Sequence, residues 1–315
     1  MGTEIWLSDP EMAYVEWQRA EATGADRRAF SEQSIIQHSS MFSRFNRYLI
    51  AHRSSVATFG ADHIDRFFAD LDGGCKSGTS TRLRYLKLID RLARHLIAQG
   101  LRTDNPTGEL LLKERWPEKE PMPAFLNSSD EARLRSTCAA RPFDSFKNLR
   151  NTAIVALLLG SGLTAAELRT LVTDDLDVSS SRVSVFVKKH GPRIARRVPV
   201  DAFAADVLRL YLDARTKMPC QGKWLFVATA SGGPMKTDRL GVYVRSALRK
   251  ADLSASDESP RLLRNTFCRR HLAEGKSNEQ VSGLLGLTSH RTVTRLRETL
   301  SDVDEIGGTA AALRQ

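Results

Sequence analysis

Residues 146–168 read FKNLRNTAIVALLLGSGLTAAEL and contain the longest uninterrupted apolar run of the chain, AIVALLL at 153–159. Such a run suits a helix buried on all sides and is far too short to span a bilayer, which takes about 20 apolar residues. The glycines at 160 and 162 predict the end of this helix. Thr164 and Glu167 then have the spacing of a capping box, so a second helix should begin at once. The stretch predicts a mainly helical domain core.

A small β-sheet is expected downstream. Residues 181–187 (SRVSVFV) alternate in polarity like a half-buried strand, and residues 194–200 can return as the partner of a hairpin around Gly191–Pro192. Trp224–Val227 (WLFV) has the composition of a further short strand. The rest of this half is predicted to be helical, over about 201–217 and from Thr237 to the end, with breaks near 254–260 and 286–290.

The first part of the chain predicts a separate domain of four or five helices. Residues 31–52 carry an apolar stripe that includes Ile36 and Ile50. Residues 80–100 form an amphipathic helix with Ile97 on its inner side and a strongly basic outer face, and this helix ends at Gly100. Three prolines and six charges within 113–127 predict an extended linker, and Ser128 with Glu131 predicts a capping box beyond it. The expected organisation is a helical domain at 1–112, a linker at 113–127 and a second domain at 128–315.

The net charge of +10 is concentrated in three windows. Residues 76–102, 181–197 and 261–297 each carry +6, so the remainder of the chain is acidic. Basic windows on an acidic background favour a polyanion partner, because phosphate contacts release condensed counterions. Double-stranded DNA is expected ahead of an anionic membrane, since no window has the apolar face of an interfacial helix.

The cysteines and the N-terminus exclude other classes of protein. Cys75, Cys138, Cys220 and Cys268 lie far apart without metal-ligand spacing, which predicts free thiols in a reducing cytoplasm and no metal site. The first residues lack a basic region followed by an apolar run, so no secretory signal is expected. No cofactor is expected.

Five segments of the second half together resemble the tyrosine recombinase (phage integrase) family, in particular its Xer-like members. They are GLTAAEL at 162–168, RRVPV at 196–200, WLFV at 224–227, PRLLRNTF to HLAEG at 260–275, and LLGLTSHRTVTRL at 284–296. The resemblance extends over residues 30–300. It implies a mainly α fold with a small β-sheet, in which a SAM-like helical core-binding domain precedes a catalytic-type domain.

The chemistry of that family requires residues that this chain largely lacks. A tyrosine hydroxyl attacks a DNA phosphodiester, two arginines and histidine-type donors stabilise the phosphate, and a hairpin lysine protonates the leaving oxygen. The last tyrosine here is Tyr243, and 72 residues follow it. By resemblance, Thr164 stands where the family has its first arginine, and the glutamate that follows it is retained as Glu167. Arg261 and Arg264 stand at the two ends of the family's His-x-x-Arg box, so its histidine is replaced and its arginine retained. Leu287 replaces the later histidine, Leu296 replaces the nucleophilic tyrosine, and the lysine is Lys189 or Lys188.

Each family residue that this chain retains has two interpretations. Arg264 is either a phosphate clamp or a remnant of catalysis, and the hairpin lysines either contact the DNA backbone or supply an acid. Thr292, Thr294 and Thr299 are poor substitutes for the nucleophile without an activating base. A shifted loop would let His290 replace the lost histidine.

The expectation is a sequence-specific, catalytically inactive DNA-binding protein that assists or regulates recombination or integration of a mobile element. The alternatives are a divergent recombinase completed in trans or using another nucleophile, and a scaffold reused for protein interaction. Partners implied by the resemblance are an active recombinase, or a second copy bound through residues 301–315, in the nucleoid of a bacterial cytoplasm. The expected DNA-binding residues are Arg82, Arg84, Lys87, Arg91, Arg94, Lys188, Lys189, Arg193, Arg196, Arg197, Arg261, Arg264, Arg291 and Arg295.

Overall fold

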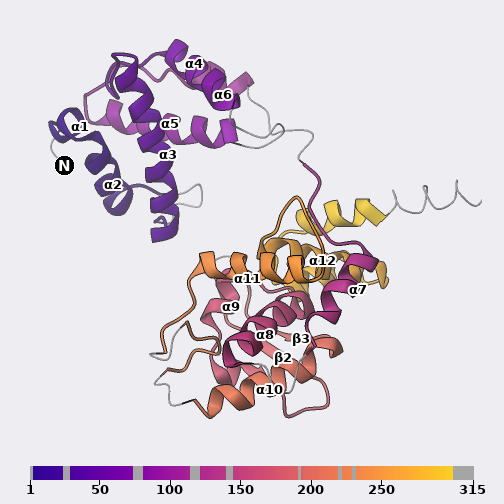
Figure 1. Cartoon of the computed structure of the whole chain (residues 1–315). Helices are drawn as coiled ribbons and strands as arrows, with labels where there is room; N and C mark the ends of the chain where they lie inside the picture. Colours follow the sequence, from indigo (N-terminus) through magenta and orange to yellow (C-terminus); the bar gives the residue numbers. More distant parts are fainter. Residues whose placement is uncertain are drawn as a thin grey trace, which may run out of the picture. The chain divides into compact units, whose positions relative to one another are not determined.

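The chain forms two compact units, Met1–Pro121 and Met122–Gln315. The structure, a computed structural model, describes residues 3–23, 29–73, 81–113, 121–139, 145–190, 193–218, 222–228 and 232–300 (Figure 1). Helices dominate both units, and the second also contains a small antiparallel sheet. The predicted fold class is confirmed. Within the described ranges, no helix combines the length and the apolar character needed to cross a membrane.

The first unit is built on aromatic packing between amphipathic helices. Phe45 lies at its centre, with ring centroids 5.3 Å from Phe59 and 5.1 Å from Phe67. Ile36 and Ile50, expected on the inner stripe, are exposed instead, because the buried stripe of their helix runs through other residues. The described helices are α1 (Ile5–Ser8), α2 (Pro10–Ala20), α3 (Glu32–Ala51), α4 (Ala61–Asp72), α5 (Thr81–Ala98) and α6 (Gly108–Lys113).

Helix α5 separates an apolar side from a basic one, as its sequence predicts. Leu86, Ile89 and Leu92 are fully buried or nearly so. Ile97, which was expected inside, lies at the exposed end of the helix. Gly100 follows the helix with φ +73°, a left-handed conformation that glycine adopts without strain.

The second unit surrounds one buried helix. Helix α8 packs against α10, α11 and α12, and lies between them in Figure 1. It ends at Ser161, and Gly162 caps it with φ +63°, which confirms the predicted glycine stop. The helices of this unit are α7 (Ser128–Ser136), α8 (Phe146–Ser161), α9 (Ala165–Thr170), α10 (Ala205–Thr216), α11 (Thr237–Lys250), α12 (Pro260–Ala273) and α13 (Asn278–Leu285).

The predicted hairpin is present, and a third strand joins it. Strands β1 (Leu176–Asp177), β2 (Ser184–Val187) and β3 (Arg196–Pro199) form an antiparallel sheet in that order. Val185 pairs with Val198 and both side chains are buried, so the inner face of the sheet is apolar. The expected strand at 224–227 is not formed; Trp224 makes only an isolated bridge to Val172. Leu225, Phe226 and Val227 are buried all the same.

Two boundaries differ from the sequence-based expectation. Asn127, not Ser128, caps α7, accepting a hydrogen bond from the Asp130 N–H. Residues 122–127, assigned to the linker, lie in the second unit, where Leu126 is buried and its N–H donates to Thr266 Oγ1 at 2.9 Å. Their apolar side chains cover α12, which an unattached linker would leave open to water.

The C-terminal part is helical in shorter pieces than expected. A break at 274–277 separates α12 from α13, where Gly275 has φ +86°. Residues 291–300 are helical after the predicted break near 286–290. Residues 301–315, considered for contact with a second copy, lie outside the described residues.

Candidate functional site

The segment between α8 and α9 forms one wall of the candidate site. Thr164 caps α9 by accepting a hydrogen bond from the Glu167 N–H. Glu167 Oε2 in turn accepts from both the backbone N–H and the hydroxyl of Thr164, each at 2.9 Å. The predicted capping box is therefore present, and it turns the Glu167 carboxylate inward.

Glu167 is the charge at the centre of the site. Its side chain has no exposed surface, and Oε1 lies 2.9 Å from Arg196 Nη1 while Oε2 lies 3.7 Å from Arg264 Nη1. Burial opposes ionisation, but hydrogen bonds from Arg196 and Thr164 and the two positive charges outweigh it and lower the pKa of Glu167. A buried, ionised carboxylate thus neutralises the arginines around it.

Arg264, the retained arginine, is held inside by backbone carbonyls. It extends from α12, and its Nη1 and Nη2 donate to Gly162 O at 2.6 Å and Leu285 O at 2.8 Å. Arg264 as a whole is only 8% exposed. Burial lowers the pKa of Arg264 to about 10; Glu167 works against that shift, and Arg193 and Arg196 add to it. The guanidinium stays charged at neutral pH, and each of its two terminal nitrogens already donates to a backbone carbonyl.

Arg196, expected on the DNA-binding surface, is instead part of this buried cluster. It comes from β3, is 9% exposed, and donates from Nε to Leu284 O at 2.7 Å as well as to Glu167. Its Nη2 is buried without a hydrogen-bond partner in the described part of the chain. Gly286, with φ +66°, leaves the space that the guanidinium occupies, because an added Cβ there would meet Arg196 Cζ at 2.8 Å.

The two leucines at family site positions differ in burial, since Leu296 is fully buried and Leu287 only partly so. Leu296 has no exposed surface and belongs to the hydrophobic core of the second unit, against which Leu287 also packs. Thr299, one candidate hydroxyl, is buried and donates to Leu296 O at 2.6 Å. His290 is exposed, and its ring is hydrogen-bonded to Ser282 at 2.7 Å.

The other predicted residues of the second unit divide by exposure. Arg261 is exposed and paired with Asp257 at 2.9 Å, and Lys188 is exposed 3.4 Å from Asp175. Lys189, Arg197 and Arg291 are exposed, whereas Arg193 and Arg295 are half-buried.

In the first unit the predicted basic residues all lie on α5. Arg84, Lys87 and Arg94 are exposed, and Arg94 is paired with Asp90 at 3.1 Å. Arg82 and Arg91 are half-buried, over the rings of Phe68 and Phe30 at 4.9 and 4.8 Å.

Sequence reasoning missed the central role of Glu167 and the arginines that organise the surrounding core. Arg270 joins Glu131 of α7 to Asp201, and Arg150 donates to Val227 O at 3.0 Å. The available signal was the position of Glu167 beside an apolar run, since a carboxylate in such a place needs a cationic partner.

Comparisons of sequence relate this chain to known proteins. The sequence pattern of the phage integrase family matches residues 124–299. The tyrosine recombinase XerD of Rhizobium meliloti (strain 1021) is 26% identical over 285 residues, covering 89% of this chain and 88% of that protein. XerD of Brucella abortus biovar 1 (strain 9-941) is 28% identical over 218 residues, or 66% of this chain and 68% of that protein.

Similarity of fold extends to solved structures. A crystal structure of the XerH site-specific recombinase, bound to a palindromic difH substrate in a post-cleavage complex, matches with a TM-score of 0.75. The match covers 99% of this chain and 97% of that chain, with 16% identity, so it bears on the fold alone.

Proposed function

Because the chain belongs to the phage integrase family of tyrosine recombinases, we propose that it is a sequence-specific double-stranded DNA-binding protein that does not cleave its site. The observation that carries this proposal is Leu296. By resemblance it holds the position of the nucleophile, and it has no exposed surface. An aliphatic side chain has no heteroatom with a lone pair and no ionisable proton, so no covalent phosphoryl–enzyme intermediate can form there.

The charges of the site support the same conclusion. Phosphoryl transfer depends on donors directed at the phosphate oxygens. Arg264 and Arg196 direct theirs at Glu167 and backbone carbonyls, and Thr164 uses its hydroxyl to cap a helix. A phosphate entering this centre would therefore compete with an internal carboxylate for the same arginines.

DNA binding is supported by the exposed cations outside this centre. Lys189 and Arg197 lie on the hairpin, and Arg84 and Lys87 lie on α5. Exposed cations of this kind give sequence-independent backbone affinity, while base contacts give the specificity. Solved relatives of the same fold are described bound to DNA, among them XerH on difH and lambda integrase on a COC′ core site.

The proposed role is an accessory or regulatory one in recombination or integration of a mobile element. A protein that occupies a recombination-type site without cutting it can recruit an active recombinase or exclude one. Association with such a recombinase or with a second copy, and residence on the bacterial nucleoid, belong to this proposal.

One experiment tests binding and chemistry together. Duplex DNA selected by the protein from a random library, nicked to trap any covalent intermediate, should be shifted on a native gel and yield no adduct after denaturation. An adduct would favour the alternative of an active, divergent recombinase. Absence of any shift at modest salt would refute DNA binding itself.

A further inference from the structure

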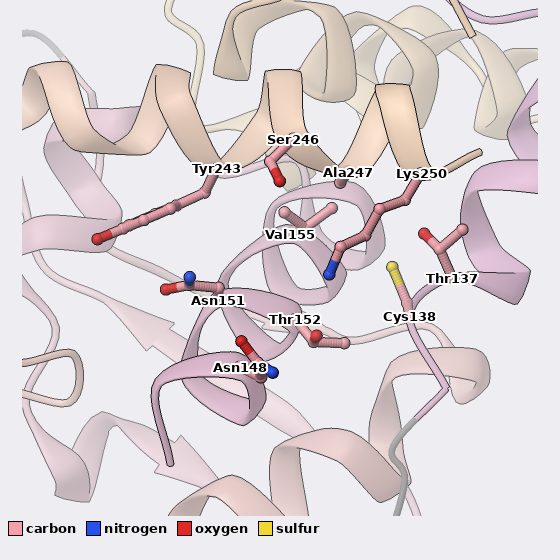
Figure 2. A pocket seen from close by; sticks show the side chains of 10 residues that line it. All are labelled: Thr137, Cys138, Asn148, Asn151, Thr152, Val155, Tyr243, Ser246, Ala247 and Lys250. Carbon is pink, nitrogen blue, oxygen red and sulfur yellow. The ribbon is translucent and has the colours of Figure 1, made fainter. Parts of the chain in front are cut away.

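A pocket of about 260 Å³ opens between α8 and α11, away from the residues of the candidate centre. Figure 2 shows its lining, with the Lys250 side chain extending into the space between the two helices. Asn148, Asn151 and Thr152 line it from α8, and Ser246 joins Lys250 on α11. Thr137 and Cys138, which follow α7, close one end.

The pocket offers hydrogen-bond donors and no negative charge. None of its ten lining residues is acidic. Asn151 Oδ1 already accepts from Arg150 Nε and Nη2 at 3.3 and 3.2 Å, so the amide group left to a ligand is the NH₂ donor. Burial raises the pKa of Cys138 to about 12, so its thiol remains neutral at physiological pH and does not neutralise Lys250.

Lys250 is the cation of this pocket. It is exposed at the last position of α11 and makes no ion pair with the residues that the structure describes. Asp252, two residues on, is paired with Arg133 at 3.3 Å. An ammonium group among amide and hydroxyl donors, without a competing carboxylate, suits an anion rich in acceptor oxygens.

The apolar part of the lining favours a phosphate ester over an inorganic phosphate ion. Val155, Ala247 and the ring of Tyr243 form an apolar side beside the donors. Arg150 Nη2 donates to the Tyr243 hydroxyl at 3.4 Å, which fixes that ring. We propose that this pocket binds the phosphate group of a nucleotide-type phosphate ester, supplied either by the DNA backbone or by a free nucleotide. Only the first source rests on the proposed DNA-binding function.

Two variants test the pocket and leave the fold intact. Lys250→Gln removes the charge at an exposed helix end. Asn151→Asp keeps the acceptor for Arg150 but replaces the NH₂ donor by an anionic oxygen. Lys147→Gln is the matched control, because Lys147 is an exposed lysine of the neighbouring α8 that does not line the pocket. Each protein is measured for duplex DNA affinity across a salt series and for binding of 5′-AMP by chemical-shift perturbation.

The two sources give different results. If the ligand is a DNA phosphate, Lys250→Gln lowers the slope of log K against log salt by about 0.9 and Asn151→Asp by at least as much, each beyond the change in Lys147→Gln. If it is a free nucleotide, 5′-AMP binds saturably to the natural protein and to Lys147→Gln, and both pocket variants lose that binding.

The inference is overturned if 5′-AMP does not bind saturably and the pocket variants match Lys147→Gln on DNA. Failure of the natural protein to bind DNA refutes the proposed function alone, because the nucleotide measurement still judges the pocket.

Discussion

At the scale of single residues, Glu167 determines how the site is held together. A carboxylate without exposed surface is tolerated here because Arg196 and Thr164 hydrogen-bond it and Arg264 lies 3.7 Å away. Glu167→Gln leaves two buried guanidinium groups without their counter-charge. We expect a loss of about 3 kcal/mol in the free energy of unfolding, measured by urea denaturation.

An exposed acid provides the control for this variant. Glu298→Gln, on the surface of the segment 291–300, should change the free energy of unfolding by less than about 0.5 kcal/mol. Equal effects of the two substitutions would mean that the buried cluster adds no stability beyond that of a surface charge.

The same carboxylate gives a dependence on pH with a defined sign. The pKa of Glu167 is lower in the folded protein than in the unfolded chain. The stabilisation by its charge is therefore fully present above the unfolded pKa of about 4.3 and is lost as the pH falls through the folded pKa. The stability difference between the natural protein and Glu167→Gln should therefore be constant from pH 7 to 5 and shrink below that. A difference that persists unchanged at pH 2 would contradict an ionised Glu167.

Restoring a tyrosine at position 296 is not expected to restore chemistry. Leu296 is enclosed in the core, so Leu296→Tyr must place a larger ring and a hydroxyl where no space is open. Overpacking should cost about 1–3 kcal/mol in the free energy of unfolding. No covalent product should form on a nicked substrate, since in the proposed correspondence Thr164 and Arg261 stand where the family has phosphate-binding and proton-sharing groups. Leu296→Phe is the control of similar size, and an adduct specific to the tyrosine variant would show that the arginine cluster is still competent.

At the scale of elements, the end of α13 and the buried arginine of β3 depend on each other. Gly286 ends α13 with φ +66°, and its missing Cβ gives room to the Arg196 guanidinium. Gly286→Ala should cost at least about 2 kcal/mol, from left-handed backbone strain and from displacement of Arg196.

Gly283 is the matched control for this substitution. It lies within α13 with nothing inside 4 Å of an added Cβ, so Gly283→Ala should stabilise the protein by about 0.5–1 kcal/mol. Thermal unfolding of the two variants should therefore shift in opposite directions. A shift of the same sign in both would mean that the glycine at 286 is not required by its surroundings.

The sequence predicted elements whose signals are local and missed those decided by tertiary packing. The stop at Gly162 and the Thr164–Glu167 box follow from backbone geometry and short-range hydrogen bonds, and both are present. Residues 224–227 are apolar like a strand but form only isolated bridges, from Trp224 to Val172 and from Val227 to Pro234, and no continuous ladder. The sequence predicts Arg196 on the DNA-binding surface together with the exposed cations. Its partner Glu167 lies 29 residues away in the sequence, and no helical or strand periodicity links residues over that separation.

At the scale of the whole molecule, the basic windows of the sequence are divided between two compact units. Only part of that charge is available to a polyanion. Arg196 and Arg264 are used inside the second unit. Lys189 and Arg197 on the hairpin stay exposed, as do Arg84, Lys87 and Arg94 of α5. The net charge alone therefore overstates the number of phosphate contacts.

The salt dependence of DNA binding measures that number directly. Arg84→Gln with Lys87→Gln removes two exposed cations from α5, and Lys189→Gln with Arg197→Gln removes two from the hairpin region. Each pair should lower the slope of log K against log salt by roughly 1.8, and all four substitutions together by roughly twice that, because each lost phosphate contact contributes about 0.9. Lys217→Gln, which removes an exposed cation paired with Asp213 on α10, should leave the slope unchanged. If neither pair alters the slope while the protein still binds DNA, its contacts lie on other surfaces, and the assignment of α5 and the hairpin to the DNA interface is wrong.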